Sequence, residues 1–481
     1  MNNMAFYKKT WFQISFIFLL AIIIFFVGLG RNYIYDWDEG IYAANALEMI
    51  KYHDPIVIRY NGLPDSRVLK FPLGVWLVAI NFKIFGVTVW ALRFWSALFS
   101  LLTVGVVYFL GRELKNRNLG LGAALIFMLS APVVGWHAGR TGDFDAGLSF
   151  FVALSILSFI LSYKRQRLKY FYGSIVAVGL GVMYKSFIAF LPLVIIGLFL
   201  LFANDKKRYL NWHVIIKSLI ILAVIIFPWL IARELSGPGY LWQVIKTDYF
   251  SRLFMTLEGH YGSFWFYIHE LKTIFYPWVI ILPIAVLYLF KKIFLDKNKL
   301  ASILLIWMAV ILVLFSAAST KLIWYILPVY PAFSLVIAWL LLDIFEFLQR
   351  SPAKTKINLF YVLFLVLFML LAIWRVEWYL RASSNQQGYF PEFLSAAKES
   401  GYTSDKLFVP QDFDTPSSFF YLQREFFGSQ FIFYKIPICV GPINSLLIID
   451  SARYEDYAKS CPEHQKLFQN NYFILTKLLH E

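Results

Sequence analysis

Charged residues and cysteines are both scarce in this chain of 481 residues. Asp, Glu, Lys and Arg make up 15% of it, against roughly 25% in an average soluble domain. Its two cysteines are too few for a disulfide framework and belong to no metal-spacing motif. No Ser-His-Asp pattern, Cys/His cluster or internal repeat is visible. These absences disfavour a soluble globular enzyme, a disulfide scaffold and a zinc module.

Long apolar runs are what the chain has instead. Hydrophobic residues make up 60% of it, and apolar runs long enough to cross a bilayer recur over the first 380 positions. The backbone groups in such runs must be paired internally, so we expect helices. We predict about eleven spans, at 11–29, 88–110, 119–136, 144–162, 170–184, 187–203, 214–232, 264–290, 300–318, 322–342 and 358–377.

The connections between these spans fall into two kinds. Five are short and basic, and all five lie on one side if the spans alternate: 111–118, 162–170, 204–213, 291–299 and 349–356. The positive-inside rule makes that side the cytoplasm. The net charge of +15 is therefore mainly an orientation signal, and dispersed basic loops disfavour a nucleic-acid partner. The first run lacks a small-residue cleavage site, so we interpret it as a span and not as a signal peptide.

The opposite connections face the extracytoplasmic side of the membrane in this interpretation. They comprise a long first loop at 30–87, a second at 233–263, three short turns and the last hundred residues. That compartment has no nucleoside triphosphates. Cys439 and Cys461 fall there, where a disulfide is permitted, and both a pair and two separate thiols remain open.

The first loop and the tail contain shorter elements. Apolar spacing predicts an interfacial amphipathic helix over 36–52, started by Asp36 or Asp38, a turn at 59–65 and a second surface helix within 69–86. In the tail we expect strands at 406–414, 444–457 and 472–479 and helices at 391–400 and 455–460. The fold class is thus an α-helical polytopic membrane domain, 1–380, followed by a small extracytoplasmic α/β domain, 381–481.

Acids and lone cations gather in the external connections: Asp38, Glu39, Lys70, Arg140, Asp143, Asp145, Lys185, His260 and Lys321. Each has a plain structural alternative: Asp38 could cap a helix, Lys185 could snorkel at the interface, and His260 could be an ordinary loop residue. As a set they suit one reaction. A carboxylate can deprotonate an acceptor, while lysine and arginine hold a phosphate leaving group. A donor outside the cytoplasm must carry its own activation, as a lipid-linked phosphosugar does.

Six of these segments, in order, resemble the GT-C type polytopic glycosyltransferases, in particular the bacterial aminoarabinose transferase-like group and the protein O-mannosyltransferases. The segments are "DEGIYAANALEMIKYHDPIVIRYNG", "LKFPLGVWL", "RTGDFDAGLSFF", "MYKSFIAFLP", "GHYGSFWFYIHELKTIFYPWVIILP" and "STKLIWYILPVYPAFSL". The resemblance covers nearly the whole chain.

The resemblance implies roles for individual residues. The catalytic acids would be Asp38, its neighbour Glu39, Asp145 and the extra carboxylate Asp143. The lipid phosphate or the sugar would be held by Lys70, Arg140, Lys185, Lys321 and Tyr325. His260 matches a position sometimes associated with a divalent metal, which leaves such a metal open as a cofactor. Leu69 and Phe71 depart from the family pattern beside Lys70, and this weighs against a bound metal.

The function expected from these observations is transfer of a sugar from a polyprenyl-phosphate donor to an extracytoplasmic acceptor: lipid A or another glycolipid, a polysaccharide or a protein. One alternative is a lipid-linked sugar flippase or small-molecule transporter, which would need polar groups through the span interiors, where almost none occur. The other is a scaffold or receptor whose tail binds a partner.

Overall fold

The computed structural model divides into two compact units, which are described separately. It describes residues 10–65, 69–135, 137–203, 205–256, 259–350, 354–382, 389–426, 428–435, 445–461 and 464–479. The first unit comprises Met1–Leu29, Leu69–Gly74 and Arg93–Ser384, and the second comprises Gly30–Val68, Val75–Leu92 and Asn385–Glu481. Much of the first loop therefore groups with the tail. The division of the chain into the domains 1–380 and 381–481 stays a prediction.

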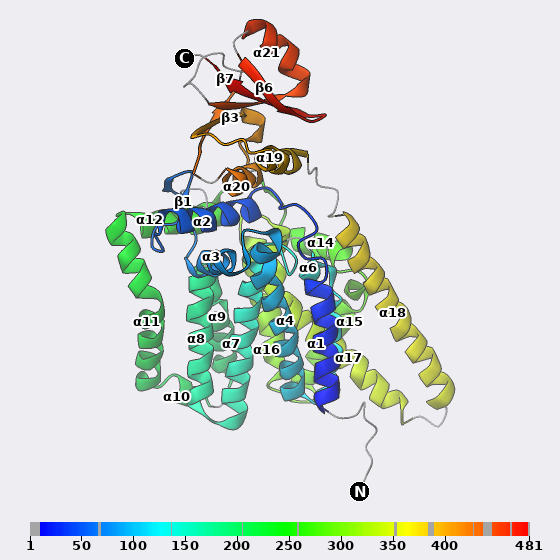
Figure 1. The fold of residues 1–481 in the computed structure, drawn as a ribbon. Helices are drawn as coiled ribbons and strands as arrows, with labels where there is room; N and C mark the ends of the chain where they lie inside the picture. Colours follow the sequence, from blue (N-terminus) through cyan, green and yellow to red (C-terminus); the bar gives the residue numbers. More distant parts are fainter. Residues whose placement is uncertain are drawn as a thin grey trace. The chain divides into compact units, whose positions relative to one another are not determined.

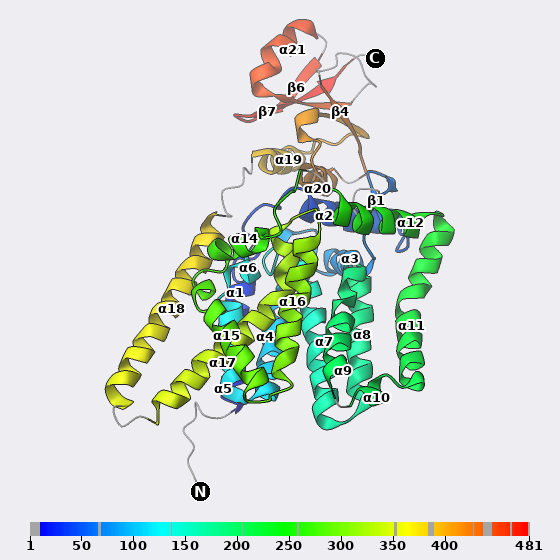
Figure 2. The same ribbon diagram turned by 180° about the vertical axis from the view of Figure 1, so that it is seen from behind.

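The first unit is a bundle of helices, most of which run along one common direction (Figures 1 and 2). They are α1 (Thr10–Phe26), α4 (Val89–Leu114), α5 (Arg117–Met128), α6 (Ala131–Val134), α7 (Asp145–Arg165), α8 (Leu168–Tyr184), α9 (Leu191–Phe202), α10 (Lys206–Tyr209), α11 (Trp212–Ser236), α12 (Tyr240–Val244), α13 (Arg252–Phe254), α14 (Phe266–Ile274), α15 (Leu282–Phe294), α16 (Ala301–Ala317), α17 (Tyr330–Leu348) and α18 (Lys354–Ala382). Among the described residues, five helical segments are long and apolar enough to cross a membrane, and shorter apolar helices accompany them. The prediction of a polytopic helical protein is confirmed, while the number of spans stays a prediction.

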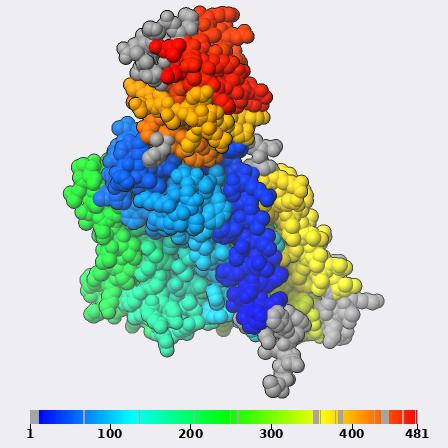
Figure 3. All heavy atoms as spheres, viewed as in Figure 1, coloured from blue at the N-terminus to red at the C-terminus, as the bar shows by residue number. Residues whose placement is uncertain are grey.

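The outward faces of this bundle are apolar. Helix α1 lies at the surface in Figure 3, and there Phe16 and Leu19 are 47% and 57% exposed. Helix α18 likewise exposes Leu363 and Leu370. Exposure of such faces to water would cost free energy, whereas the apolar chains of lipid solvate them.

The segment predicted as one span, 264–290, is interrupted. Helix α14 ends at Ile274, a 3₁₀ turn, η4, covers Trp278–Ile280, and α15 begins at Leu282. Pro277 lies in the break and has no N–H to donate to the preceding turn, which explains why the helix does not continue.

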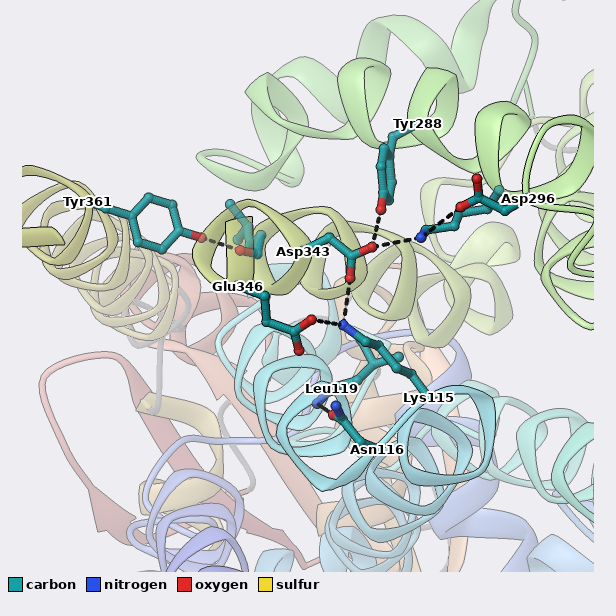
Figure 4. Close-up of polar contacts among 10 residues, drawn as sticks. Lys115, Asn116, Leu119, Tyr288, Asp296, Asp343, Glu346 and Tyr361 are labelled. Carbon is teal, nitrogen blue, oxygen red and sulfur yellow. Dashed lines mark hydrogen bonds and ion pairs between the residues drawn. The ribbon is translucent and has the colours of Figure 1, made fainter. Parts of the chain in front are cut away.

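Ion pairs join the basic connections at one end of this unit. Between α15 and α17, the Asp343 carboxylate lies 2.8 Å from Lys292 Nζ and 2.7 Å from Lys115 Nζ, and it accepts a hydrogen bond from Tyr288 (Figure 4). Lys115 also lies 2.6 Å from Glu346. Nearby, Lys164 pairs with Glu113 at 3.2 Å. The basic loops that follow α4, α7 and α15 therefore lie at the same end, as alternating spans require.

In the second unit, helix α2 (Asp38–Tyr52) packs against α20 (Pro416–Glu425). A Cβ on Gly40 would lie 2.6 Å from the backbone nitrogen of Ser417, so only glycine permits this approach. All residues of α2 from Glu39 to Met49 are buried. The expectation of a one-sided amphipathic helix is therefore wrong, because the helix is covered on more than its apolar stripe.

The start of α2 also differs from expectation. Trp37 holds the N-cap position and makes no side-chain cap, and Asp38 is the first helical residue. The Asp36 carboxylate instead accepts the backbone N–H of Ser417, at 3.0 Å, at the start of α20. The predicted turn is confirmed: β1 (Arg59–Tyr60) and β2 (Leu63–Pro64) form a hairpin. Its central residues, Asn61 and Gly62, have positive φ, as a tight hairpin turn requires. Helix α3 (Leu73–Phe85) follows, as predicted.

The tail forms a small α/β domain, as predicted. Its sheet has the order β4-β3-β5-β7-β6, from β3 (Lys406–Pro410), β4 (Gln430–Tyr434), β5 (Leu446–Asp450), β6 (His464–Gln469) and β7 (Phe473–Leu478). Strands β3, β4 and β5 are parallel, and β7 is antiparallel to both neighbours. Helices α19 (Tyr389–Glu399) and α20 lie on one side of the sheet and α21 (Tyr454–Ser460) on the other (Figures 1 and 2). Cys461 is buried with the α21 layer, and Cys439 lies outside the described residues.

Glu48 links the parts of this second unit and should make its stability depend on pH. The carboxylate accepts the backbone N–H of Gly62 at 3.0 Å and the amide of Gln423 at 2.8 Å. Burial raises the pKa of Glu48, although these hydrogen bonds and Lys51 partly offset the effect. For a carboxyl whose pKa is raised by folding, stability is full below the unfolded pKa of about 4.3 and falls as pH rises through the folded pKa.

We therefore expect Glu48→Gln to remove part of the loss of stability that the wild type shows as pH rises above about 4.3. Thermal unfolding of both proteins in detergent, from acidic to neutral pH, measures this difference. Glu399→Gln, at an exposed helix end, is the matched control. A difference between Glu48→Gln and wild type that stays constant with pH would contradict the assignment.

Candidate active site

Four ionisable side chains meet at the start of α7, and we call them the α7 cluster: His137, Asp143, Asp145 and Lys185. Lys185 Nζ pairs with Asp145 Oδ1. His137 Nδ1 lies 3.3 Å from Asp143 Oδ1 and 4.0 Å from Asp145 Oδ2. The cluster lies at the end of α7 opposite its basic carboxyl-terminal turn.

The cluster is buried. Asp143 is 1% exposed and Asp145 2% exposed. Buried carboxylates are tolerated when they are paired, and Lys185 supplies the pairing charge for Asp145. Asp145 is also the first residue of α7, where the positive end of the helix dipole favours an anion. The structure therefore brings together three of the residues predicted for the site, Asp143, Asp145 and Lys185, while their roles stay a prediction.

Contacts from the neighbouring helices α4 and α8 hold the α7 cluster in place. Ser96 on α4 donates its hydroxyl to the backbone carbonyl of Asp143 at 2.7 Å. The Tyr184 ring packs against Gly147, where an added Cβ would lie 2.1 Å from a ring carbon. Gly147 is therefore needed for the approach of α8 to α7, and this approach brings Lys185, the next residue after Tyr184, to Asp145.

An aromatic ring covers the histidine. The rings of His137 and Trp324 are stacked, with centroids 3.5 Å apart and planes 4° from parallel. Trp324 belongs to the 3₁₀ segment η5 (Ile323–Val329), which leads into α17. Neither ring was among the residues predicted for the site. Trp324 lies within the quoted segment "STKLIWYILPVYPAFSL", and His137 lies three residues before the quoted segment "RTGDFDAGLSFF".

Two of the predicted cationic ligands cap helices. Arg140 donates to the carbonyls of Ile24 and Val27, at 2.7 and 2.8 Å, where α1 ends. Lys321 is buried and donates to the carbonyls of Phe315, Ser316 and Ala318, at the end of α16. Last-turn carbonyls lack partners within a helix, and cations there are favourable. Burial lowers the pKa of Lys321. The geometry thus favours capping roles, and phosphate binding by these two residues stays a prediction.

Lys70 and Tyr325, two further residues predicted to bind the phosphate or the sugar, have different contacts from Arg140 and Lys321. The carbonyl of Lys70 accepts a hydrogen bond from Tyr240 at 2.8 Å, and the next residue, Phe71, packs on Phe187 and Trp229. The Lys70 side chain is half-buried. Tyr325 accepts a hydrogen bond from Arg252 Nη1 at 2.7 Å, so a cation that sequence analysis did not select accompanies this tyrosine.

The remaining predicted residues are Asp38, Glu39 and His260. In the second unit, Asp38 is half-buried at the start of α2, and the buried Glu39 accepts the backbone N–H of Tyr35 at 2.8 Å. His260, in the first unit, is exposed, and its carbonyl accepts the backbone N–H of Lys321 at 3.0 Å. Within the described ranges, His260 joins no group of three acid, histidine or cysteine side chains close enough to share one ion. A metal at His260 stays a prediction.

Sequence comparisons point to transferases that use lipid-phosphate sugars. The model of the dolichyl-phosphate-mannose-protein mannosyltransferase family matches residues 70–231. An undecaprenyl phosphate-α-4-amino-4-deoxy-L-arabinose arabinosyl transferase of Pectobacterium carotovorum is 29% identical over 67% of this chain, and the match spans 58% of that protein's length. An uncharacterised protein of Aquifex aeolicus is 26% identical over 78% of this chain and 71% of its own.

Solved structures match over a greater length. ArnT from Cupriavidus metallidurans, in a crystal structure with undecaprenyl phosphate bound, has a TM-score of 0.73 and 17% identity, and the match covers 98% of this chain and 99% of that one. The archaeal oligosaccharyltransferase AglB from Archaeoglobus fulgidus has a TM-score of 0.62 and 14% identity, over 90% of this chain and 65% of its own. At these identities the match shows that the fold is shared.

Proposed function

We propose that this chain, a polytopic glycosyltransferase of the GT-C type that resembles the aminoarabinose transferases, moves a sugar from a polyprenyl-phosphate donor to an acceptor outside the cytoplasm. The observation that carries the proposal is the α7 cluster, a buried set of acids and a lone lysine in a chain with this fold. Buried ionisable groups among membrane helices are costly and mark functional sites by default.

The reaction exchanges one bond for another at the anomeric carbon of the sugar. The acceptor oxygen or nitrogen attacks that carbon opposite the phosphate, the bond from carbon to phosphate oxygen breaks, and polyprenyl phosphate leaves. Asp38 takes the acceptor's proton as general base. Lys70 and the Arg252–Tyr325 pair stabilise the charge that develops on the phosphate.

The α7 cluster supplies carboxylates in addition to that of Asp38. Asp145, held by Lys185, orients the acceptor or the sugar, and Asp143 adds negative charge beside it. Arg140 and Lys321 fix the ends of α1 and α16.

The two ends of the helical unit support a proposal for the side of the membrane on which the site lies. The basic connections gather at one end, and the positive-inside rule assigns that end to the cytoplasm. The α7 cluster lies at the opposite end of the same helices. We therefore place the site on the extracytoplasmic face of a bacterial cytoplasmic membrane, where glycolipids such as lipid A, polysaccharides and proteins are available as acceptors.

Mass spectrometry of lipids and glycans from cells with and without the gene tests this function. We expect one class of envelope molecule to lose a single sugar in the deletion strain, and the matching polyprenyl-phosphate sugar to accumulate. Complementation with the wild-type gene should restore the modification. Unchanged lipids, glycans and donor pools in the deletion strain would refute the proposal.

A further inference from the structure

We propose that His137 is a positioning residue for the transfer reaction, which holds the carboxylates of Asp143 and Asp145 through its Nδ1 atom while Trp324 fixes its ring. This inference rests on the proposed function. We assign His137 no chemical step of its own, so it is a positioning residue and not a catalytic one.

The Nδ1 atom of His137 is the ring atom that lies next to the two carboxylates. Nδ1 faces both carboxylates, at 3.3 Å from Asp143 and 4.0 Å from Asp145. The histidine is 6% exposed, so water does not screen these contacts effectively. Two neighbouring carboxylates repel each other, and Lys185 pairs with Asp145. The imidazole places a polar ring edge against Asp143 as well.

Trp324 determines which edge of the imidazole meets the acids. Parallel stacking at 3.5 Å leaves the ring little freedom to tilt. Trp324 comes from η5, more than 180 positions further along the chain, so the contact ties the turn before α7 to the segment that leads into α17. A change at either ring should move the carboxylates even though neither ring has an obvious chemical step to perform.

The backbone at His137 makes an atom-specific test available. Its φ is 55°, in the left-handed region, which asparagine tolerates better than most residues. Asparagine also places an amide nitrogen where Nδ1 lies, whereas glutamine places one nearer Nε2. His137→Asn should thus keep both the backbone and the contact, while His137→Gln keeps the polarity and loses the position.

The experiment measures kcat and donor KM of the purified full-length protein with a polyprenyl-phosphate sugar. We expect His137→Asn to stay within about 3-fold of wild type, and His137→Gln and His137→Leu to lose about 10- to 100-fold in kcat with little change in KM, as small misplacements of reacting groups do. Trp324→Leu should behave like His137→Leu, and Trp324→Phe should keep most of the activity. Because leucine at position 137 is strained, the Trp324 pair tests the same contact without altering that backbone.

The exposed His269 on α14 supplies the matched control, since His269→Asn and His269→Leu should both equal wild type. An active wild type with an equally active His137→Leu would overturn the inference alone, and so would a His137→Asn variant as weak as His137→Leu. A bound metal that disappears in the His137 variants would make this residue a ligand and overturn the positioning role. A wild type that transfers no sugar from any polyprenyl-phosphate donor would sink the proposed function and this inference with it.

Discussion

Replacement of Asp38 by asparagine is expected to lower transfer by about 10²- to 10⁴-fold, the range for loss of a general base, while the protein stays folded. Asparagine has the same shape and cannot accept the acceptor's proton. Asp38 is half-buried and is the first residue of α2, so neutralising it removes little structure. The rate of sugar transfer, and the donor KM, would be measured on purified protein.

Asp36 offers a control two residues away. Its exposed carboxylate accepts the backbone N–H of Ser417, so Asp36→Asn should reduce thermal stability slightly and leave kcat unchanged. If Asp38→Asn keeps full activity, the base is another group. If both variants lose activity in proportion to their loss of folded protein, the effect of Asp38 is structural.

Removal of Lys185 should be the most destabilising single change in the α7 cluster. Lys185→Met leaves Asp145 buried and without its ion-pair partner, and breaking a buried pair from one side costs about 3–5 kcal/mol. We expect a large fall in the thermal unfolding temperature in detergent, together with loss of transfer.

The double variant separates stability from chemistry. Asp145→Asn combined with Lys185→Met removes both charges, so stability should return toward wild type while transfer stays absent. Lys169→Met, an exposed lysine at the start of α8, is the matched control and should change neither property. Equal stability of Lys185→Met and wild type would mean that the pair contributes nothing, and an active double variant would exclude both residues from the reaction.

The helical spans were largely predictable because their apolar length is a local property of the sequence. Chain breaks were predictable in principle: Pro277 divides 264–290, although the apolar run continues through it. In the tail, the buried strands β3, β5 and β7 were identified, while the polar edge strand β6 and the strand β4 were not. Helix α20 was also missed, because its buried Phe419, Phe420 and Tyr421 are residues typical of strands.

The site was predictable only where neighbours in sequence are neighbours in space. Asp143 and Asp145 lie two positions apart, and Lys185 directly follows α8, so the packing of α8 against α7 brings Lys185 to Asp145. Arg140, three positions before Asp143, caps α1 instead. The capping of α1 by Arg140 and of α16 by Lys321 depends on where a helix ends in three dimensions, which spacing does not reveal. The stacking of Trp324 on His137 joins residues far apart in sequence and had no local signal.

The ion pairs around Asp343 bear on how the surrounding bilayer acts on this enzyme. Trp324 and Asp343 lie 19 positions apart on the continuous helical stretch of η5 and α17, a length of about 30 Å, comparable to the hydrocarbon thickness of a membrane. The stretch is thus attached to neighbouring parts of the chain near both of its ends, by salt bridges at Asp343 and by aromatic stacking at Trp324. These attachments should keep the angle between the stretch and its neighbouring helices fixed, so we expect a thinner or thicker membrane to be met by tilting of the whole helical unit or by deformation of the lipid.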